Sequence, residues 1–167
     1  MLHSKIVTFI NEHEDLINAG NFEAIYELIG DKYYDTFIFY NCGKFTKALY
    51  DAGIDPLQNS EYLFDNFLVN VEFPEFKLPQ HIKDLGVSCF YNAAVDHIEI
   101  PEGVTHIRTE TFMDGNFKSI KLPKSIELIS QNAFDDCMCG TIYVYENSYA
   151  AKFVEECFTS DVIHYRK

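Results

Sequence analysis

Tryptophan is absent from this chain of 167 residues, and basic residues are scarce. Only 13 lysines and arginines stand against 26 aspartates and glutamates, which gives a formal net charge of −13 at pH 7. A surface with this charge repels nucleic acid phosphates and anionic membranes. We therefore expect no direct nucleic acid binding and no membrane binding.

Long apolar runs are missing too. The N-terminal stretch MLHSKIVTFINEHEDL lacks the uninterrupted apolar segment of roughly 7 to 15 residues that a secretion signal needs. No later run approaches the roughly 20 apolar residues of a membrane span. The five cysteines form an odd, unevenly spaced set, as free thiols in a reducing compartment do. These absences predict a cytoplasmic protein, in the host cytoplasm if a phage encodes it.

Motifs that carry chemistry are also missing. Cys137 and Cys139 are separated by one residue, whereas zinc knuckles use two residues and need a second pair. His13 and Glu14 begin like a zinc-protease helix, but Ile17 stands where the second histidine belongs. No Gly-x-Ser-x-Gly and no glycine-rich phosphate loop occur. We expect no enzyme: no catalytic residue, no metal and no cofactor.

What the chain does have is a repeated apolar pattern. Hydrophobic residues make up 47% of the chain, and Pro79, Pro101 and Pro123 follow one another at intervals of 22 residues. A unit of this size cannot bury its own apolar face, so successive units must stack and share one core. Whole apolar columns keep the same interval: Phe76, Ile98, Ile120 and Ile142; Leu78, Ile100, Leu122 and Val144; Ile82, Val104 and Ile126; Leu85, Ile107 and Ile129; Phe90, Phe112 and Phe134.

Each unit is predicted to hold one short strand and one turn. Two apolar positions alternate with an outward position before each proline, which is the pattern of a strand. The proline ends the strand, because it has no N–H to donate. Asn92, Asp114 and Asp136 share a later column, and residues of these types favour turns.

The pattern I-x-I-P-x-x-V-x-x-I-x-x-x-x-F, from Phe76 to Tyr145, resembles the leucine-rich repeats of the BspA-like class. The resemblance implies right-handed coils with a short parallel strand on one side and loops or short helical turns on the other, and it implies binding, not catalysis. Cys89 and Thr111 depart from the third unit, which has Ala133 in that column. We predict an α+β fold: a short right-handed leucine-rich-repeat solenoid of about 3–4 coils with helical caps.

Residues 1–70 do not follow the period and are predicted to form an α-helical N-terminal cap. Apolar faces indicate helices over 2–17, 22–30 and 45–52, and the uniformly apolar segment 33–40 is also assigned to helix. Gly20 with Asn21, and later Gly53, supply the residues that end and begin such helices.

The repeats are expected over 71–147, followed by a C-terminal cap over 148–167. Ser148 is predicted to be the N-cap of a closing helix. One face of that helix would carry Ala150, Phe153, Val154 and Cys157. Val162 to Tyr165 then predict a last strand.

Two surfaces are candidate binding sites. The outward positions of adjacent strands hold Lys77, Glu99, Lys121 and Tyr143, whose opposite charges predict a cross-strand ladder worth tenths of a kcal/mol per pair. This row is either a solvated face or a binding strip that also includes Glu75, His97, Ser119 and Thr141. The second surface is an aromatic cluster in the N-terminal cap that includes Tyr33, Tyr34, Phe37 and Tyr40. These rings either form an interface or pack against the first coil or a second copy of the chain, as a homodimer.

Two functions fit these features, and both bind another protein. The first is a non-catalytic protein–protein interaction module, phage-encoded or bacterial, that binds or inhibits its partner through the aromatic cap. In the second, the acidic surface that includes Glu12, Glu14 and Asp15 imitates nucleic acid and blocks the basic groove of a nuclease or an anti-phage defence complex, in the manner of an anti-CRISPR protein.

Overall fold

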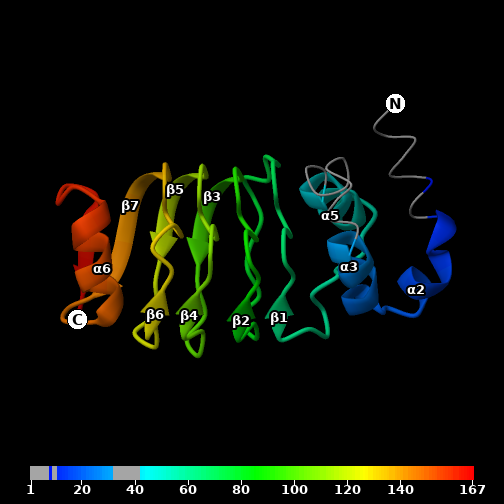
Figure 1. The fold of residues 1–167 in the computed structure, drawn as a ribbon, viewed down its shortest axis with the longest axis horizontal. Coiled ribbons are helices and arrows are strands. Elements are labelled where there is room, and N and C mark those ends of the chain that lie inside the picture. The colour runs from blue at the N-terminus through cyan, green and yellow to red at the C-terminus, as the bar shows by residue number, and fades with distance from the viewer. Residues whose placement is uncertain (1–7, 9–10, 32–41) are drawn as a thin grey trace.

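The computed structural model describes Thr8 and residues 11–31 and 42–167, which form an elongated solenoid with helices at both ends (Figure 1). The helices described at the N-terminal end are α2 (Glu14–Asn18), α3 (Phe22–Asp31) and α5 (Cys42–Asp51). One helix, α6 (Tyr149–Cys157), closes the opposite end. Among the described residues, no helix combines the length and the apolar character needed to cross a membrane.

The principal sheet has four parallel strands in the order β3-β5-β7-β8. Their bounds are Ala94–Glu99, Asn116–Lys121, Met138–Tyr145 and Ile163–Arg166. Ile98 pairs with Ile120, and Ile120 pairs with Ile142, and all three side chains are buried. The 22-residue period therefore stacks equivalent residues directly on one another, as the repeat predicts.

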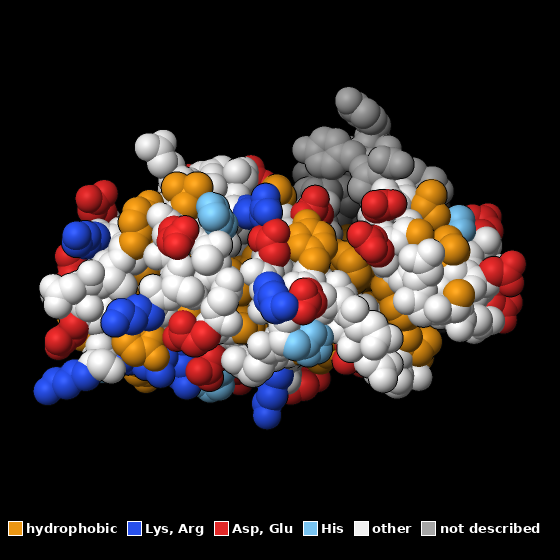
Figure 2. All heavy atoms as spheres, turned by 90° about the horizontal axis from the view of Figure 1, so that it is seen from below, with side chains coloured by type: hydrophobic (Ala, Val, Ile, Leu, Met, Phe, Trp, Pro, Cys, Tyr) orange, Lys and Arg blue, Asp and Glu red, His pale blue; other side chains and the backbone are white. Residues whose placement is uncertain are grey.

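A second set of short parallel strands runs along the lower edge of the solenoid in Figure 1. Here β1 (Tyr62–Leu63) pairs with β2 (Asp84–Leu85), and β4 (His106–Ile107) pairs with β6 (Leu128–Ile129). Figure 2, which views the molecule from below, shows charged side chains of both signs spread over this part of the solenoid.

The solenoid has about five turns, more than the 3–4 coils predicted. The helical assignment is wrong for the segment around β1, because Leu63 stacks under Leu85 and Leu68 occupies the column of Phe90. This coil was not predicted because the repeat was aligned on Pro79, Pro101 and Pro123, and the position 22 residues before Pro79 holds Leu57. This first coil keeps the apolar positions of the short second strand and of the turn after it, but it lacks the proline that ends the first strand in later coils.

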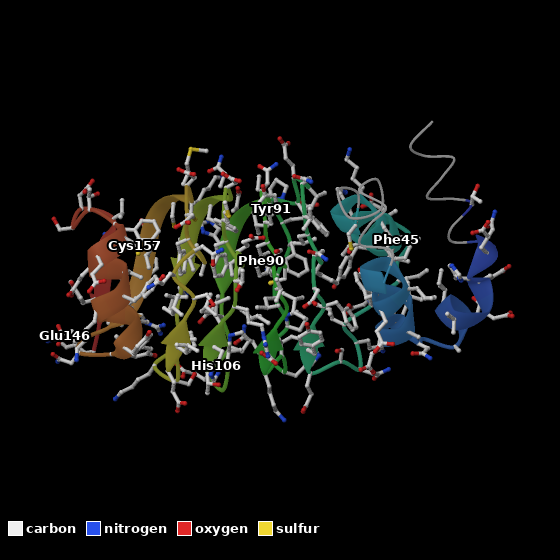
Figure 3. All side chains as sticks on the ribbon, viewed as in Figure 1. Phe45, Phe90, Tyr91, His106, Glu146 and Cys157 are labelled. Atoms are coloured by element: carbon white, nitrogen blue, oxygen red, sulfur yellow. The ribbon has the colours of Figure 1, made fainter. Side chains whose placement is uncertain are left out.

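A column of phenylalanine rings fills the centre of the solenoid. The Phe90 and Phe112 rings are stacked with centroids 5.5 Å apart, and the Phe112 and Phe134 rings follow at 5.0 Å. Figure 3 shows Phe90 inside the solenoid, between the two sets of strands. Phe153 of α6 continues the column, with its ring 6.2 Å from that of Phe134. The helix therefore covers the apolar end of the array, as a cap must.

The predicted turn column is confirmed by its backbone. Asn92, Asp114 and Asp136 have φ values of +47°, +56° and +53°, in the left-handed region that asparagine and aspartate tolerate better than most residues. A second left-handed residue stands four positions earlier in two of these coils, at Ser88 and Glu110. Serine and glutamate do not favour the left-handed conformation, so the sequence did not predict it at these two positions.

The helix ends largely follow the predictions. Asn21 caps α3, because its Oδ1 accepts a hydrogen bond from the Ala24 N–H at 3.3 Å. Gly20 and Gly53 both have positive φ and end the preceding helices. Within the helix predicted over 2–17, the described residues Thr8, Asn11 and Glu12 are helical, and α2 follows from Glu14 after a turn at His13. The segment 33–40 lies outside the described residues.

The C-terminal cap also follows the prediction, with one exception. The Ser148 hydroxyl accepts a hydrogen bond from the Ala151 N–H at 3.0 Å, and β8 adds the predicted last strand. Ala150 and Val154 are buried and Phe153 is half-buried. Cys157, the last residue of α6, is exposed, however.

Candidate interaction surfaces

The structure brings three of the predicted binding residues together on the principal sheet. Glu99, Lys121 and Tyr143 occupy equivalent positions on β3, β5 and β7 and point away from the core. The Lys121 Nζ lies 3.3 Å from the Glu99 Oε2, so this rung of the predicted charge ladder forms. Both side chains keep 41% and 51% of their surface exposed, respectively, and remain accessible to a partner.

A fourth member of this row, His164 on β8, was missed by the sequence analysis. His164 pairs with Tyr143, and the two rings lie 5.6 Å apart. The step from Tyr143 to His164 is 21 residues instead of 22, because the chain passes through α6 before it returns to the sheet. The 22-residue interval therefore does not predict His164 as a member of this row.

A second outward row lies two residues closer to the start of each strand. His97 pairs with Ser119, and Ser119 pairs with Thr141. The His97 Nδ1 and the Ser119 Oγ are hydrogen-bonded at 2.8 Å. We call the outward side chains of these two rows the strand face: Glu99, Lys121, Tyr143, His164, His97, Ser119 and Thr141.

The other rung of the predicted ladder, between Lys77 and Glu99, does not form. Lys77 makes no ion pair within the described residues, and the segment that carries it is not a strand. Instead, this segment lines a hollow of about 380 Å³ together with residues of β3 and β5. Its walls include Lys77, Gln80, Glu99 and Lys121.

The acidic residues predicted for the second function lie at the helical end and are exposed: Glu12, Glu14 and Asp15. Glu23 and Glu27 of α3 are exposed as well, and residues 11–31 contain no lysine or arginine. In Figure 2, this end of the molecule shows acidic side chains without basic ones. The predicted aromatic residues Tyr33, Tyr34, Phe37 and Tyr40 lie outside the described residues.

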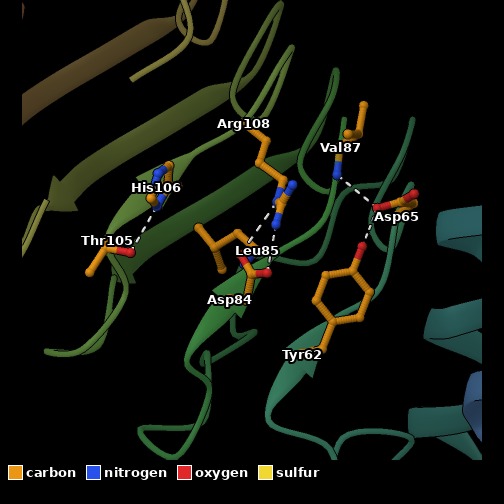
Figure 4. A network of polar contacts seen from close by, with 8 residues as sticks. All are labelled: Tyr62, Asp65, Asp84, Leu85, Val87, Thr105, His106 and Arg108. Atoms are coloured by element: carbon orange, nitrogen blue, oxygen red, sulfur yellow. Dashed lines mark hydrogen bonds and ion pairs between the residues drawn. The ribbon is translucent and has the colours of Figure 1, made fainter. Parts of the chain in front are cut away.

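Among the described acids of the solenoid, four differ, because they are paired with a base of a neighbouring coil: Glu61, Asp84, Asp96 and Glu99. Figure 4 shows Arg108, whose Nη2 donates to the Asp84 Oδ2 at 2.7 Å. The neighbouring Asp65 accepts hydrogen bonds from the Tyr62 hydroxyl and from the Val87 N–H. The Arg108–Asp84 and Asp65–Val87 contacts join successive coils, so we assign them a structural role.

The cysteine side chains offer no activated nucleophile. All five are free, and burial raises the pKa of each thiol above its ordinary value. A raised pKa keeps the thiol protonated near pH 7, whereas a reactive cysteine needs a lowered one. The described part of the chain also lacks a group of three or more histidine, cysteine or acidic residues arranged to hold a metal ion.

These features define a short leucine-rich-repeat solenoid whose accessible surfaces are suited to binding. Residues 32–162 match the family described as BspA type leucine rich repeat region, with six copies of the repeat. The match covers most of the chain, which therefore belongs to the BspA-type leucine-rich repeat family. No curated protein and no solved structure matches the chain. Repeat domains of this class generally mediate contacts with other proteins and are not catalytic.

Proposed function

We propose that this protein is a non-catalytic binding module that recognises another protein through its strand face. One observation carries the proposal: Glu99, Lys121, Tyr143 and His164 form a continuous outward row over four paired strands. The row offers two charges of opposite sign and two aromatic rings. Aromatic residues supply large contact area at low entropic cost, and the charges fix the orientation of a partner.

Rigidity of the strand face supports this proposal. Glu99, Lys121 and Tyr143 each lie between two buried residues, as Tyr143 does between Ile142 and Val144. A side chain fixed on a packed sheet loses little conformational entropy when it binds, so more of the contact energy appears as affinity. The aromatic cluster of the N-terminal cap remains a proposed second contact, and a second copy of the chain remains a proposed alternative partner.

Affinity measurements with single variants test this proposal. After capture and identification of a partner from bacterial lysate, we expect Tyr143→Ala to weaken its binding at least about tenfold, the equivalent of roughly 1.4 kcal/mol. Leu128→Ala is the matched control, because Leu128 is an exposed apolar residue on the opposite edge of the solenoid. A loss of affinity in the control with none in Tyr143→Ala would refute the assignment of the strand face.

We also propose a second function, in which the module is a phage-encoded or bacterial inhibitor that acts in the cytoplasm and imitates nucleic acid. Its support is the helical end, where Glu12, Glu14 and Asp15 are exposed and no base of the same segment compensates them. Such a surface complements the basic groove of a nuclease or of an anti-phage defence complex.

Salt dependence separates the two functions. Docking into a basic groove should weaken steeply as the ionic strength rises and should compete with DNA, whereas binding through the strand face should change little. Neutralising Glu12, Glu14 and Asp15 together should relieve inhibition. The control variant neutralises three exposed acids of the repeats and C-terminal cap, Glu127, Glu146 and Glu156, with the same change in net charge. Equal inhibition by both triple variants would contradict the mimicry.

A further inference from the structure

We propose that the hollow between residues 75–80 and β3 binds an extended acidic peptide segment of the partner protein. This inference rests on the proposed role of the strand face, because the hollow lies at the edge of that surface. It adds the chemistry of the ligand: a chain that pairs with β3 and carries a carboxylate side chain.

The hollow exists because the backbone ladder opens at this point. The preceding coil is joined to the start of β3 by the Phe73 N–H, which donates to the Ala94 oxygen at 2.8 Å. The Asp96 N–H then donates to the Pro74 oxygen at 3.1 Å. From Glu75 onward, the described residues show no backbone hydrogen bond between this coil and β3.

The two prolines of the segment account for this opening in part. Pro74 and Pro79 have no N–H to donate, and their fixed φ angles turn the chain away from a continuous strand. In the next coil the ladder does not open, since β3 remains paired with β5 as far as Glu99 and Lys121. One edge of β3 from His97 to Glu99 is therefore left without a neighbouring strand.

An unpaired strand edge is suited to an extended peptide. Its free backbone groups can hydrogen-bond to an added strand, and the adjacent side chains then select the sequence that binds. The space of about 380 Å³ beside β3 has an apolar floor of Leu78 and Ile98. This floor can receive the inward side chain of the added segment, because alternate residues of a strand point to opposite faces.

The charges around the hollow select for an acidic ligand. Lys77 and Lys121 both line it, and Glu99 is the one acidic residue among the lining residues. Glu99 is engaged by Lys121, and Lys77 has no ionic partner within the described residues. A positive charge is therefore uncompensated here, in a chain whose net charge is −13. By contrast, Lys118, on the neighbouring strand β5, is paired with Asp96 at 2.6 Å.

A titration followed by NMR tests the proposal with a defined probe. The probe is a six-residue peptide of alternating glutamate and threonine, blocked at both ends, added to the isotope-labelled full chain. We expect concentration-dependent shifts of the His97, Ile98 and Glu99 amides. The same peptide with glutamine in place of glutamate should bind at least about tenfold more weakly, because charge-assisted contacts are lost.

Three variants make the assignment specific. Lys77→Gln should weaken peptide binding about tenfold, and Lys152→Gln, which removes another exposed lysine, on α6, should leave it unchanged. Glu99→Gln should strengthen binding severalfold, because it removes the competing carboxylate and frees Lys121. All three residues are exposed, so these variants leave the core intact.

Several results would overturn the proposal. Binding of the glutamine peptide as tightly as the glutamate peptide would show that charge is not recognised. Acetate or inorganic phosphate that binds as tightly as the peptide would indicate a site for small anions. If the peptide does not bind but Tyr143→Ala still weakens partner binding, the hollow has no such role and the strand face retains its own.

Discussion

The rings of Phe90 and Phe112 are 22 residues apart in the chain and nearly parallel in space, with 5.5 Å between their centroids and 2° between their planes. Phe134 continues the stack on the other side of Phe112. One side chain thus contacts both neighbouring coils, and its removal affects two interfaces between coils at once.

Phe112→Ala should therefore lower the free energy of unfolding by about 3–5 kcal/mol, the cost of lost apolar burial together with the cavity that remains. The measurement is urea denaturation followed by circular dichroism. Leu128→Ala is the control, because Leu128 is 50% exposed and its truncation should cost less than about 0.5 kcal/mol. Similar losses in the two variants would show that the stack is not the centre of the core.

The ion pair between Lys121 and Glu99 should contribute little to stability. Both side chains are substantially exposed, so solvent and salt screen the pair, and a double-mutant cycle should give a coupling below about 0.5 kcal/mol. Arg108 and Asp84 provide a comparison, because the guanidinium makes two hydrogen bonds to that carboxylate. Their coupling should be larger, up to about 1 kcal/mol. A coupling above about 1.5 kcal/mol for Lys121 and Glu99 would contradict the binding role proposed for these residues, because it would give them a structural one.

The hydrogen bond from the Ala151 N–H to the Ser148 hydroxyl should stabilise α6 and so the C-terminal cap. Ser148→Ala removes the acceptor of the Ala151 N–H and should cost about 1 kcal/mol, whereas Ser148→Asp should retain most of the stability because aspartate also caps helices. Ser160→Ala changes an exposed serine beyond the helix and serves as the control. Thermal unfolding of the four proteins measures the effect. A Ser148→Asp variant as unstable as Ser148→Ala would argue against capping.

Alkaline pH should destabilise the fold through its buried thiols. Burial raises the pKa of Cys42 and Cys89 above the ordinary value of 9.0. The folded state therefore keeps protons that the unfolded state loses above about pH 9, so the free energy of unfolding decreases as the pH rises past that point. The largest slope is about 1.4 kcal/mol per pH unit for each thiol. Below pH 8 these two groups should contribute no pH dependence.

Cys89→Ala isolates one of the two contributions. Ala133 occupies the same column in the next coil but one, so alanine is compatible with this position of the repeat. Denaturation curves at pH 7, 9 and 10 should show a smaller decrease in stability for this variant than for the parent chain. An unchanged decrease would mean that the Cys89 thiol does not ionise on unfolding.

Which core residues stack on one another could be predicted from the sequence, because the apolar residues recur every 22 positions. Ile98, Ile120 and Ile142 had to lie in one column once the coils stacked, and the structure pairs them directly. The same reasoning failed at both ends of the array. Leu57 replaces the proline that marked the register of the first strands, and His164 joins the sheet after an interval of 21 residues.

The candidate binding surfaces were predictable only as far as the strand pattern extends. Alternation placed Glu99, Lys121 and Tyr143 outward, and they are outward. The same pattern predicted that Lys77 would pair with Glu99. That prediction was wrong. The coil that carries Lys77 loses its backbone hydrogen bonds to β3 after Pro74, so Lys77 and Glu99 do not stand on adjacent paired strands as Glu99 and Lys121 do.

The sequence by itself determined the stacked core and the identity of its columns, because burial of apolar residues at a fixed interval leaves one arrangement that covers them all. Only the tertiary structure decided where the ladder opens beside β3 and which charges find a partner. Those outcomes depend on the path of one coil relative to the next, and a local pattern of residue types does not specify that path.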